Sequence, residues 1–367
     1  MHHPGLPKVL DDFNMEVGAG SRTAVLGANG AGKTTLFYTL TGVYKPQEGE
    51  VLYNGAPLDY SREGLTQLRS EVSVVLQNPD EQMFCSLVEE DVAFGPLNLD
   101  LDRDEVEKRI DEALREVRMT DFRKRPLQQL SGGQRKRVAI AGALAVRPKV
   151  MIMDEPTAGL DPQASMEVLE LAEKLHLQGV TVIISTHDID LAYSWADDIN
   201  VLRHGTKVFS GTSEDFYSDT ENVLLCGLLP PSTFAMNREV STINGIDEHP
   251  CPRNVCQFLA KFGKNKGSPG RIFCVPCCTE DAASCYDAAV RDAGMDSMIG
   301  VYGSETRNAL SGQKIDFYFN GIDSCFSEAV MGRDAVLLYD SIYETTVREQ
   351  AETVRGLGVD IRLEVVR

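Results

Sequence analysis

The sequence is short of positive charge and contains no long apolar run. It has 36 Lys and Arg residues against 55 Asp and Glu residues, which gives a formal net charge of −19. Nucleic-acid binding requires a basic surface, so this imbalance argues against a nucleic-acid partner. No stretch reaches the ~20 consecutive apolar residues of a membrane-spanning helix. The first residues lack a basic segment followed by an apolar run, so we expect no signal peptide.

The strongest signal is a glycine-rich turn between an apolar run and a helix. Ala24-Val25-Leu26 is typical of a buried strand, Gly27 to Gly32 form the turn, and Lys33-Thr34-Thr35 open the helix. The pattern G-x-x-x-x-G-K-[ST] is that of a phosphate-binding P-loop. Its backbone N–H groups surround phosphate oxygens, and a Cβ at Gly30 or Gly32 would obstruct their path. A chance turn is the alternative, and the strand–turn–helix context argues against it.

Side chains in and beyond the P-loop supply the rest of a nucleotide site. Lys33 can reach the β- and γ-phosphates, and the Thr34 hydroxyl can ligate Mg²⁺. Asp154 and Glu155 follow the apolar run 149–153, and open α/β sheets bind ligands at such strand ends. The first acid suits a Mg²⁺ site and the second suits a base for water. The alternative is that this pair only caps the next helix. The presence of a P-loop in the same chain argues against that alternative.

Six segments stand in the order found in ABC-transporter ATPases. They are Gly27 to Thr34, Gln77, Leu130 to Gln134, Val150 to Glu155, Ala158 to Asp161, and His187. The chain therefore resembles this family over about residues 5–230, and the resemblance implies binding of ATP and Mg²⁺. The P-loop residues that would hold the nucleotide are Gly27, Asn29, Gly30, Ala31, Gly32, Lys33, Thr34 and Thr35.

The same resemblance implies roles for the residues outside the P-loop. Thr34 and Gln77 would complete the Mg²⁺ shell, with Asp154 behind it. Glu155 would polarise the attacking water, and His187 would contact the γ-phosphate, so that Gln77, Glu155 and His187 form the catalytic set. Phosphoryl transfer needs mainly positioning and charge stabilisation, which such a set provides.

Two segments would act across a dimer of ATPase subunits. The signature Ser131-Gly132-Gly133-Gln134 would face the γ-phosphate of the opposite subunit, and Asp161 would join the two sites. The family usually stacks an aromatic side chain on adenine from a loop just ahead of the position of Pro4-Gly5. His3 stands there instead, so we expect weak discrimination of the base.

A narrower resemblance is to the energy-coupling-factor importers, and among them to the ATPases of cobalt and nickel uptake. It rests on residues 77–84, on residues 88–98 with their Phe-Gly-Pro-Leu-Asn run, and on Val138 to Gly142. It implies an ATP-hydrolysing subunit on the cytoplasmic face of the cell membrane, paired with a second ATPase subunit that is either a copy or a paralogue. A transmembrane coupling subunit and a substrate-binding membrane subunit would complete the importer. A vitamin importer and a soluble ABC ATPase outside transport are the alternatives.

The region after Gln77 meets a helix of the membrane partner in such importers. Met83, Phe84 and Leu87 are apolar and adaptable enough to line that groove. Packing in the protein core is the alternative for each of them.

The length of 367 residues and a change of pattern near residue 230 predict more than one domain. We expect an α/β fold: a P-loop NTPase ABC cassette over residues 1–228, with a RecA-like core and a helical signature subdomain. Leu229-Pro230-Pro231 opens a predicted linker over 229–268. Residues 269–367 alternate apolar runs with helical patterns, which predicts a smaller α/β domain with a mainly parallel sheet. Its predicted strands are 271–275, 298–302, 315–319, 335–339 and 361–366.

Cysteines concentrate in that second domain. Seven of the nine lie after residue 250, and Cys274, Cys277, Cys278 and Cys285 stand close together in sequence. A chain that works with cytoplasmic ATP is expected to keep its thiols free or bound to metal rather than in disulfides. Clustered thiolates suit Zn²⁺, Cu⁺ or an iron–sulfur cluster. The spacing matches no strong zinc signature, and buried packing of small apolar thiols is the leading alternative.

Overall fold

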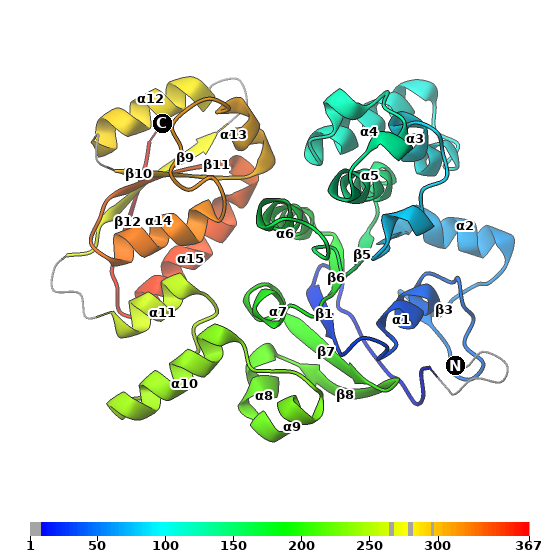
Figure 1. The fold of residues 1–367 in the computed structure, drawn as a ribbon, viewed down its shortest axis with the longest axis horizontal. Coiled ribbons are helices and arrows are strands. Elements are labelled where there is room, and N and C mark those ends of the chain that lie inside the picture. Colours follow the sequence, from blue (N-terminus) through cyan, green and yellow to red (C-terminus); the bar gives the residue numbers. More distant parts are fainter. Residues whose placement is uncertain (1–8, 264–267, 278–281, 295–296, 367) are drawn as a thin grey trace. The chain divides into compact units, whose positions relative to one another are not determined.

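The computed structural model describes residues 9–263, 268–277, 282–294 and 297–366, and the chain divides into two compact units (Figure 1). The first unit contains the residues up to Ser165 together with Gln178–Pro230. The second contains Met166–Leu177 and the residues from Pro231 onwards. Helix α6 (Pro162–Leu177) therefore starts in the first unit and continues in the second.

The first unit is built on a six-stranded sheet in the order β4-β5-β6-β1-β7-β8. The strands are β1 Arg22–Leu26, β4 Val72–Val75, β5 Val150–Asp154, β6 Thr181–Ser185, β7 Asp198–Arg203 and β8 Thr206–Gly211. All neighbours are parallel except β7 and β8, which form a hairpin. The strands at the centre are apolar and buried along most of their length, as expected for a parallel sheet covered on both faces.

Helices and one small hairpin complete the first unit. The helices are α1 Lys33–Leu40, α2 Arg62–Glu71, α3 Val88–Leu97, α4 Arg103–Glu116, α5 Gly132–Ala145, α7 Ile189–Trp195, α8 Ser213–Ser218 and α9 Thr220–Leu225. Helices α3, α4 and α5 pack against one another and form the predicted helical subdomain that carries the signature. Strands β2 (Leu52–Tyr53) and β3 (Ala56–Pro57) pair around Asn54-Gly55, a sequence that favours a tight hairpin turn.

The second unit contains a four-stranded parallel sheet in the order β10-β11-β9-β12, which confirms the predicted fold class. Its strands are β9 Arg271–Cys277, β10 Met298–Tyr302, β11 Ala335–Asp340 and β12 Arg362–Val365, and its helices after β9 are α12 Ala282–Ala293, α13 Ser304–Ala309, α14 Gly321–Val330 and α15 Glu344–Gly356. Figure 1 shows α12 on one face of the sheet and α14 and α15 on the other. The predicted strand at 315–319 is wrong, because only Phe317 makes a bridge, to Gly300.

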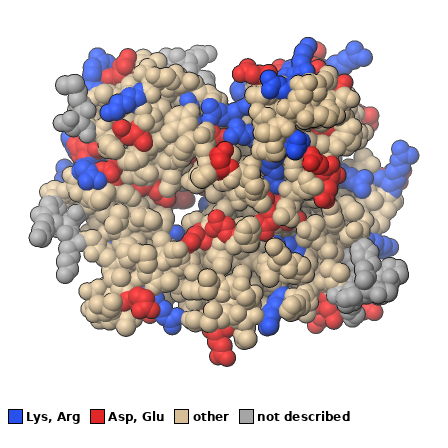
Figure 2. Space-filling model, viewed as in Figure 1, with Lys and Arg blue, Asp and Glu red and all other residues tan. Residues whose placement is uncertain are grey.

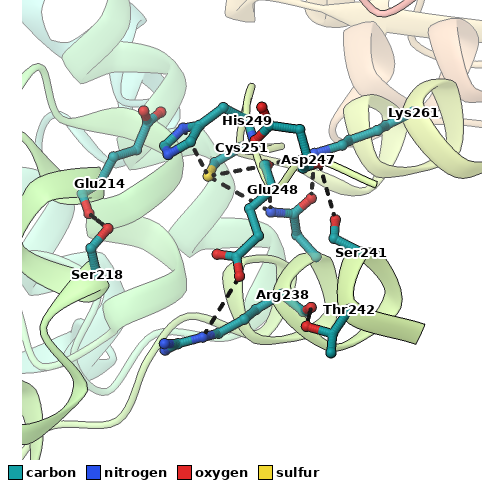
Figure 3. A network of polar contacts seen from close by, with 11 residues as sticks. Glu214, Ser218, Arg238, Ser241, Thr242, Asp247, Glu248, His249, Cys251 and Lys261 are labelled. Carbon is teal, nitrogen blue, oxygen red and sulfur yellow. Dashed lines mark hydrogen bonds and ion pairs between the residues drawn. The ribbon is translucent and has the colours of Figure 1, made fainter. Parts of the chain in front are cut away.

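The stretch 229–268, predicted as a linker, contains helices α10 (Ser232–Asn244) and α11 (Val255–Phe262). Cys256 and Ala260 of α11 are buried in the core of the second unit. Lys261 donates to the Glu248 carbonyl at 2.5 Å (Figure 3). It also donates to Asn237 Oδ1 at 2.8 Å and to the Pro250 carbonyl at 3.0 Å, and these contacts stabilise the segment before α11. The two prolines that suggested a linker precede α10 rather than a flexible segment. Among the described helices, none is long and apolar enough to cross a membrane.

Candidate functional site

The predicted P-loop joins the end of β1 to the start of α1 and depends on glycine backbone geometry. Gly27 has φ +153°, and a Cβ there would lie 2.5 Å from the Leu202 carbonyl oxygen. Gly32 has φ +109°, and its Cβ would lie 3.1 Å from the Val9 carbonyl oxygen. Gly30 differs from the sequence expectation, because no atom lies within 4 Å of its Cβ position and only its φ of +80° requires glycine.

Two pairs of polar side chains meet beside this loop. The Thr34 hydroxyl donates to Asp154 Oδ2 at 2.6 Å. The Lys33 ammonium is buried, donates to the Gly27 carbonyl at 2.7 Å and lies 3.5 Å from Glu155 Oε1. The structure thus joins the P-loop to the acidic pair that the sequence places about 120 residues later. The other oxygen of Asp154 accepts a hydrogen bond from the Ser185 hydroxyl at the end of β6.

Glu155 is the most constrained residue of the site. Its φ is +46°, a left-handed conformation that is uncommon for a residue other than glycine. Its side chain is only 3% exposed, and Oε2 lies 2.7 Å from His187 Nδ1. Its other oxygen, Oε1, accepts no hydrogen bond from the described residues. In the described part of the chain this oxygen forms only the 3.5 Å ion pair with Lys33, so it is suited to accept a hydrogen bond from a bound molecule.

The hard oxygen donors of the site fit a magnesium ion. The Thr34 hydroxyl and the Asp154 carboxylate are adjacent, and Mg²⁺ prefers such ligands. Gln77 is exposed and follows β4, whose neighbour β5 ends at Asp154. The parallel pairing brings the ends of these strands to the same edge of the sheet.

The remaining predicted site residues lie elsewhere or outside the described residues. The Ser131 hydroxyl accepts from Gln134 N at 3.3 Å while Gln134 Oε1 accepts from Ser131 N at 2.9 Å, a capping box at the start of α5 that also contains Gly132 and Gly133. Asp161 Oδ1 accepts from Ala164 N at 2.8 Å and so caps α6. Gly27 to Thr35 are all in or next to the P-loop, and His3 lies outside the described residues.

Lys136 is a residue that the sequence analysis missed. Its buried ammonium donates to the carbonyl oxygens of Leu76 at 3.0 Å, Gln77 at 2.9 Å and Glu155 at 3.3 Å. Three donors therefore meet three acceptors, and α5 is tied both to the segment after β4 and to the residue after β5. Burial lowers the pKa of Lys136 to about 8, although Asp154 and Glu155 oppose this shift.

A signal for Lys136 is present in the sequence. It stands three, four and seven residues before Ala139, Ile140 and Ala143, which form the buried stripe of α5. A lysine on that stripe must find acceptors, because an unpaired charge is rarely buried.

Comparisons with known proteins agree with this geometry. The family model described as ABC transporter matches residues 10–158. The energy-coupling factor transporter ATP-binding protein EcfA of Methanocaldococcus jannaschii is 47% identical over 229 residues, which are 62% of this chain and 82% of that protein. The protein EcfA2 of Methanospirillum hungatei, with the same description, is 36% identical over 357 residues, 95% of this chain and 89% of that protein. The chain belongs to the ATP-binding proteins of energy-coupling-factor ABC transporters.

Solved structures of ABC-transporter ATP-binding proteins are also similar. CbiO1 of Clostridium perfringens, described as part of the ABC transporter complex CbiONQ, has a TM-score of 0.53 at 39% identity and covers 64% of this chain and 88% of its own. A dimeric ATP-binding cassette bound to ADP and Pi has a TM-score of 0.52 at 29% identity, covering 56% of this chain and 90% of its own. The energy-coupling-factor protein described here is therefore an ATPase.

The proposed thiolate cluster of this ATPase is corrected by the strand geometry. Cys274 and Cys277 are three residues apart on β9, so their side chains leave opposite faces of the sheet and enter different apolar clusters. Cys285 contacts the cluster of Cys277, and Cys278 lies outside the described residues. Within the described part of the chain no three His, Cys, Asp or Glu side chains are placed to hold a metal. Burial raises the pKa of both Cys274 and Cys277 to about 12, as expected for core thiols.

Proposed function

We propose that this ATPase energises an importer of the energy-coupling-factor type from the cytoplasmic face of the cell membrane, and that the cargo is cobalt or nickel ions. The observation that carries the proposal is the hydrogen bond of Thr34 to Asp154 together with the ion pair of Lys33 and Glu155. These contacts occur in a chain that is related over 95% of its length to EcfA2 of M. hungatei. A binding protein with a vestigial site would not need to retain these partners together.

Each side chain has one task in the proposed reaction. The P-loop amides from Gly27 to Thr35 and the Lys33 ammonium bind the β- and γ-phosphates of ATP. Thr34, Gln77 and Asp154 are the residues that would hold Mg²⁺, which neutralises charge on the phosphates when bound. Lys33 moves from Glu155 to phosphate, which leaves Oε1 of Glu155 to accept a proton from the attacking water. His187 holds the opposite oxygen of Glu155 and contacts the γ-phosphate.

A second ATPase subunit, a copy or a paralogue, completes the site. Ser131 to Gln134 lie at the amino end of α5, where backbone N–H groups and the helix dipole favour an anion. They contact the γ-phosphate of the opposite subunit, and Asp161 joins the two sites. ATP binding then closes the dimer and hydrolysis opens it. The likeness to a cassette described as dimeric supports this arrangement.

An exposed aromatic pair is the proposed contact with the transmembrane coupling subunit. Phe84 is 61% exposed and Phe94 is 48% exposed, with their ring centroids 4.4 Å apart. Leu97, one turn beyond Phe94 on α3, is also exposed. Met83 and Leu87, which the sequence analysis grouped with Phe84, are half-buried beside them. An apolar surface of this kind suits a short helix of the membrane partner.

The cargo assignment is supported by the run Phe94 to Asn98 and by the likeness to CbiO1, which is described as part of the complex CbiONQ. A vitamin importer remains the alternative, because the cargo is chosen by the substrate-binding membrane subunit. A soluble ABC ATPase acting on nucleic acid has less support. The net charge is −19, and the face drawn in Figure 2 intersperses acidic and basic side chains.

Purification of the tagged full chain from native membranes tests the proposal. We expect a multi-span coupling subunit and a small substrate-binding membrane protein to copurify, and membranes to take up radioactive cobalt or nickel only with ATP. Phe84→Ala should reduce recovery of the coupling subunit, while Leu52→Ala, an exposed apolar control on β2, should not. Recovery of soluble partners alone would contradict the importer, and uptake of a vitamin instead of metal would contradict the cargo.

A further inference from the structure

Helix α6 carries three charged side chains that are buried. They are Glu170, Glu173 and Lys174, at the i, i+3, i+4 spacing of one helix face. Charged side chains are rarely buried unless they are paired. A face of this kind on an ordinary surface helix would point into water, so its burial indicates specific packing against other elements.

Those elements lie in the second unit, to which these α6 residues also belong. The Arg307 guanidinium donates to both oxygens of Glu170 at 2.7 and 2.8 Å. The Tyr343 hydroxyl donates to the backbone carbonyl of Glu170 at 2.9 Å. Lys174 forms an ion pair with Glu305 at 3.2 Å. The Thr346 hydroxyl donates to Glu173 Oε1 at 3.3 Å. The contacts come from α13, from α15 and from the turn that precedes α15.

Arg307 is held in one geometry from several sides. Its side chain is 0% exposed, and its Nε donates to the Tyr318 carbonyl at 3.0 Å. The rings of Tyr318 and Phe319 lie 5.5 and 5.6 Å from the guanidinium carbon. A planar fork that binds both carboxylate oxygens and stacks on rings fixes direction as well as distance, which a lysine would not do.

These groups stand at the edge of the sheet where α/β proteins normally bind ligands. Helix α13 follows β10, and the Asp340 carboxylate at the end of β11 accepts from Thr306 N at 2.6 Å and from Glu305 N at 3.2 Å. The carboxyl ends of parallel strands form the usual ligand edge. In this unit a helix of the same chain occupies that edge.

Helix α6 contains both Glu170 and, at its amino end, the residues capped by Asp161. Asp161 caps the helix, and Glu170 lies nine residues further, about 14 Å along the axis at 1.5 Å per residue. A continuous helix transmits the position of one end to the other. Glu170 and the residue that caps α6 therefore belong to one uninterrupted helix.

We propose that Arg307 is a positioning residue for ATP hydrolysis, acting through Glu170 and α6 on Asp161, so that the second unit controls closure of the ATPase dimer. The inference rests on the proposed role of Asp161 across the dimer. It gives a function to the C-terminal unit that needs neither a metal nor a nucleotide bound to it.

The test replaces both members of the pair, since exchange of a buried ion pair for apolar residues usually preserves folding whereas loss of one partner does not. The variant carries Glu170→Met and Arg307→Met in the full chain purified with its partner subunits. We expect kcat to fall about ten-fold and the Hill coefficient for ATP to fall toward 1. The dissociation constant of a fluorescent ATP analogue should change less than about two-fold.

Two further variants separate positioning from general damage. Tyr343→Phe removes only the hydroxyl that binds the Glu170 carbonyl, and it should lower kcat and the Hill coefficient in the same direction by a smaller factor. Arg271→Met removes an exposed ion pair with Asp334 at 2.6 Å in the same unit, and it should change neither. Normal kcat and normal cooperativity in the variant that carries both Glu170→Met and Arg307→Met would overturn the proposal. Loss of ATP affinity in parallel with kcat would overturn it too, because that pattern indicates structural damage. The membrane copurification above tests the importer without any of these variants, so the two failures are distinguishable.

Discussion

The two parallel sheets of this protein use their carboxyl edges in opposite ways. In the first unit Lys33, Asp154 and Glu155 gather at that edge, and Glu155 Oε1 is left without a hydrogen-bond donor among the described residues. In the second unit Arg307 and Asp340 stand at the corresponding edge. The Glu170 carboxylate accepts from Arg307, and the Asp340 carboxylate accepts from Thr306 N. The first edge, beside the P-loop, is called the open edge below, and the second, which helix α6 occupies, is called the closed edge.

The difference shows that strand topology locates a possible site but does not decide whether a ligand binds there. Both edges obey the rule for open α/β sheets. What separates them is the kind of group left without a hydrogen bond among the described residues. At the first edge it is an acceptor, Glu155 Oε1, whereas at the second the carboxylates are paired internally and a donor, Arg307 Nη1, is left over. Substitutions at the two edges should therefore differ in their effects.

The largest effect is expected from Glu155→Gln at the open edge. The amide keeps the shape of the side chain but cannot accept a proton from water, so kcat should fall by about 10²- to 10⁴-fold. Binding of ATP should persist, because Lys33 and the P-loop are unchanged. Steady-state hydrolysis and equilibrium nucleotide binding measure the two quantities. Glu221→Gln on the exposed face of α9 is the matched control and should retain full turnover. Unchanged turnover in Glu155→Gln would remove Glu155 from its role.

The sequence alone predicted the open edge far better than the closed one. The P-loop and the acids after β5 are recognisable because each is a motif of consecutive residues. The structure then brings the two motifs together through the hydrogen bond of Thr34 to Asp154. The pairing of Glu170 with Arg307 spans 137 residues and has no local pattern. Helices α10 and α11 were mistaken for a linker because two prolines dominated the local signal, although the cap Asn254 and the buried Cys256 define α11. Tertiary contacts stabilise helix α11, and a local sequence pattern does not reveal such contacts.

A pH-dependent stability difference is expected for Lys136→Met, next to the open edge. Burial lowers the pKa of Lys136 to about 8, against ~10.5 in the unfolded chain. Between these values the unfolded state binds more protons, so the free energy of unfolding of the natural protein rises with pH relative to the variant. The gain approaches about 3 kcal/mol above pH 10.5 and is lost as pH falls through 8. Urea unfolding of both proteins from pH 7.5 to 10.5 gives the difference, and a flat difference would contradict the assigned pKa.

A smaller loss of stability is expected for Cys274→Ser in the second unit. Cys274 is buried in the cluster that includes Cys325 and Leu337, so Cys274→Ser would place a hydroxyl among apolar side chains. Burial of an unpaired hydroxyl costs about 1–3 kcal/mol, while ATP turnover should be unchanged. Cys85→Ser, at a half-buried thiol of the first unit, is the control and should have less effect. Stoichiometric zinc in the purified protein that disappears with Cys274→Ser would show instead that the second unit holds a metal.

The smallest effect is expected from Arg271→Met, at the amino edge of the same sheet. Arg271 at the start of β9 contacts Asp334 at 2.6 Å, and this pairing raises the pKa of Arg271. The arginine is nonetheless well exposed, so water solvates both charges once the pair is broken. The urea midpoint should therefore match that of the natural protein, whereas Arg307→Met, which strands the buried Glu170 carboxylate, should lower it clearly. Equal shifts of the urea midpoint for the two arginine variants would contradict the claim that the buried pairing of Arg307 with Glu170 stabilises the closed edge.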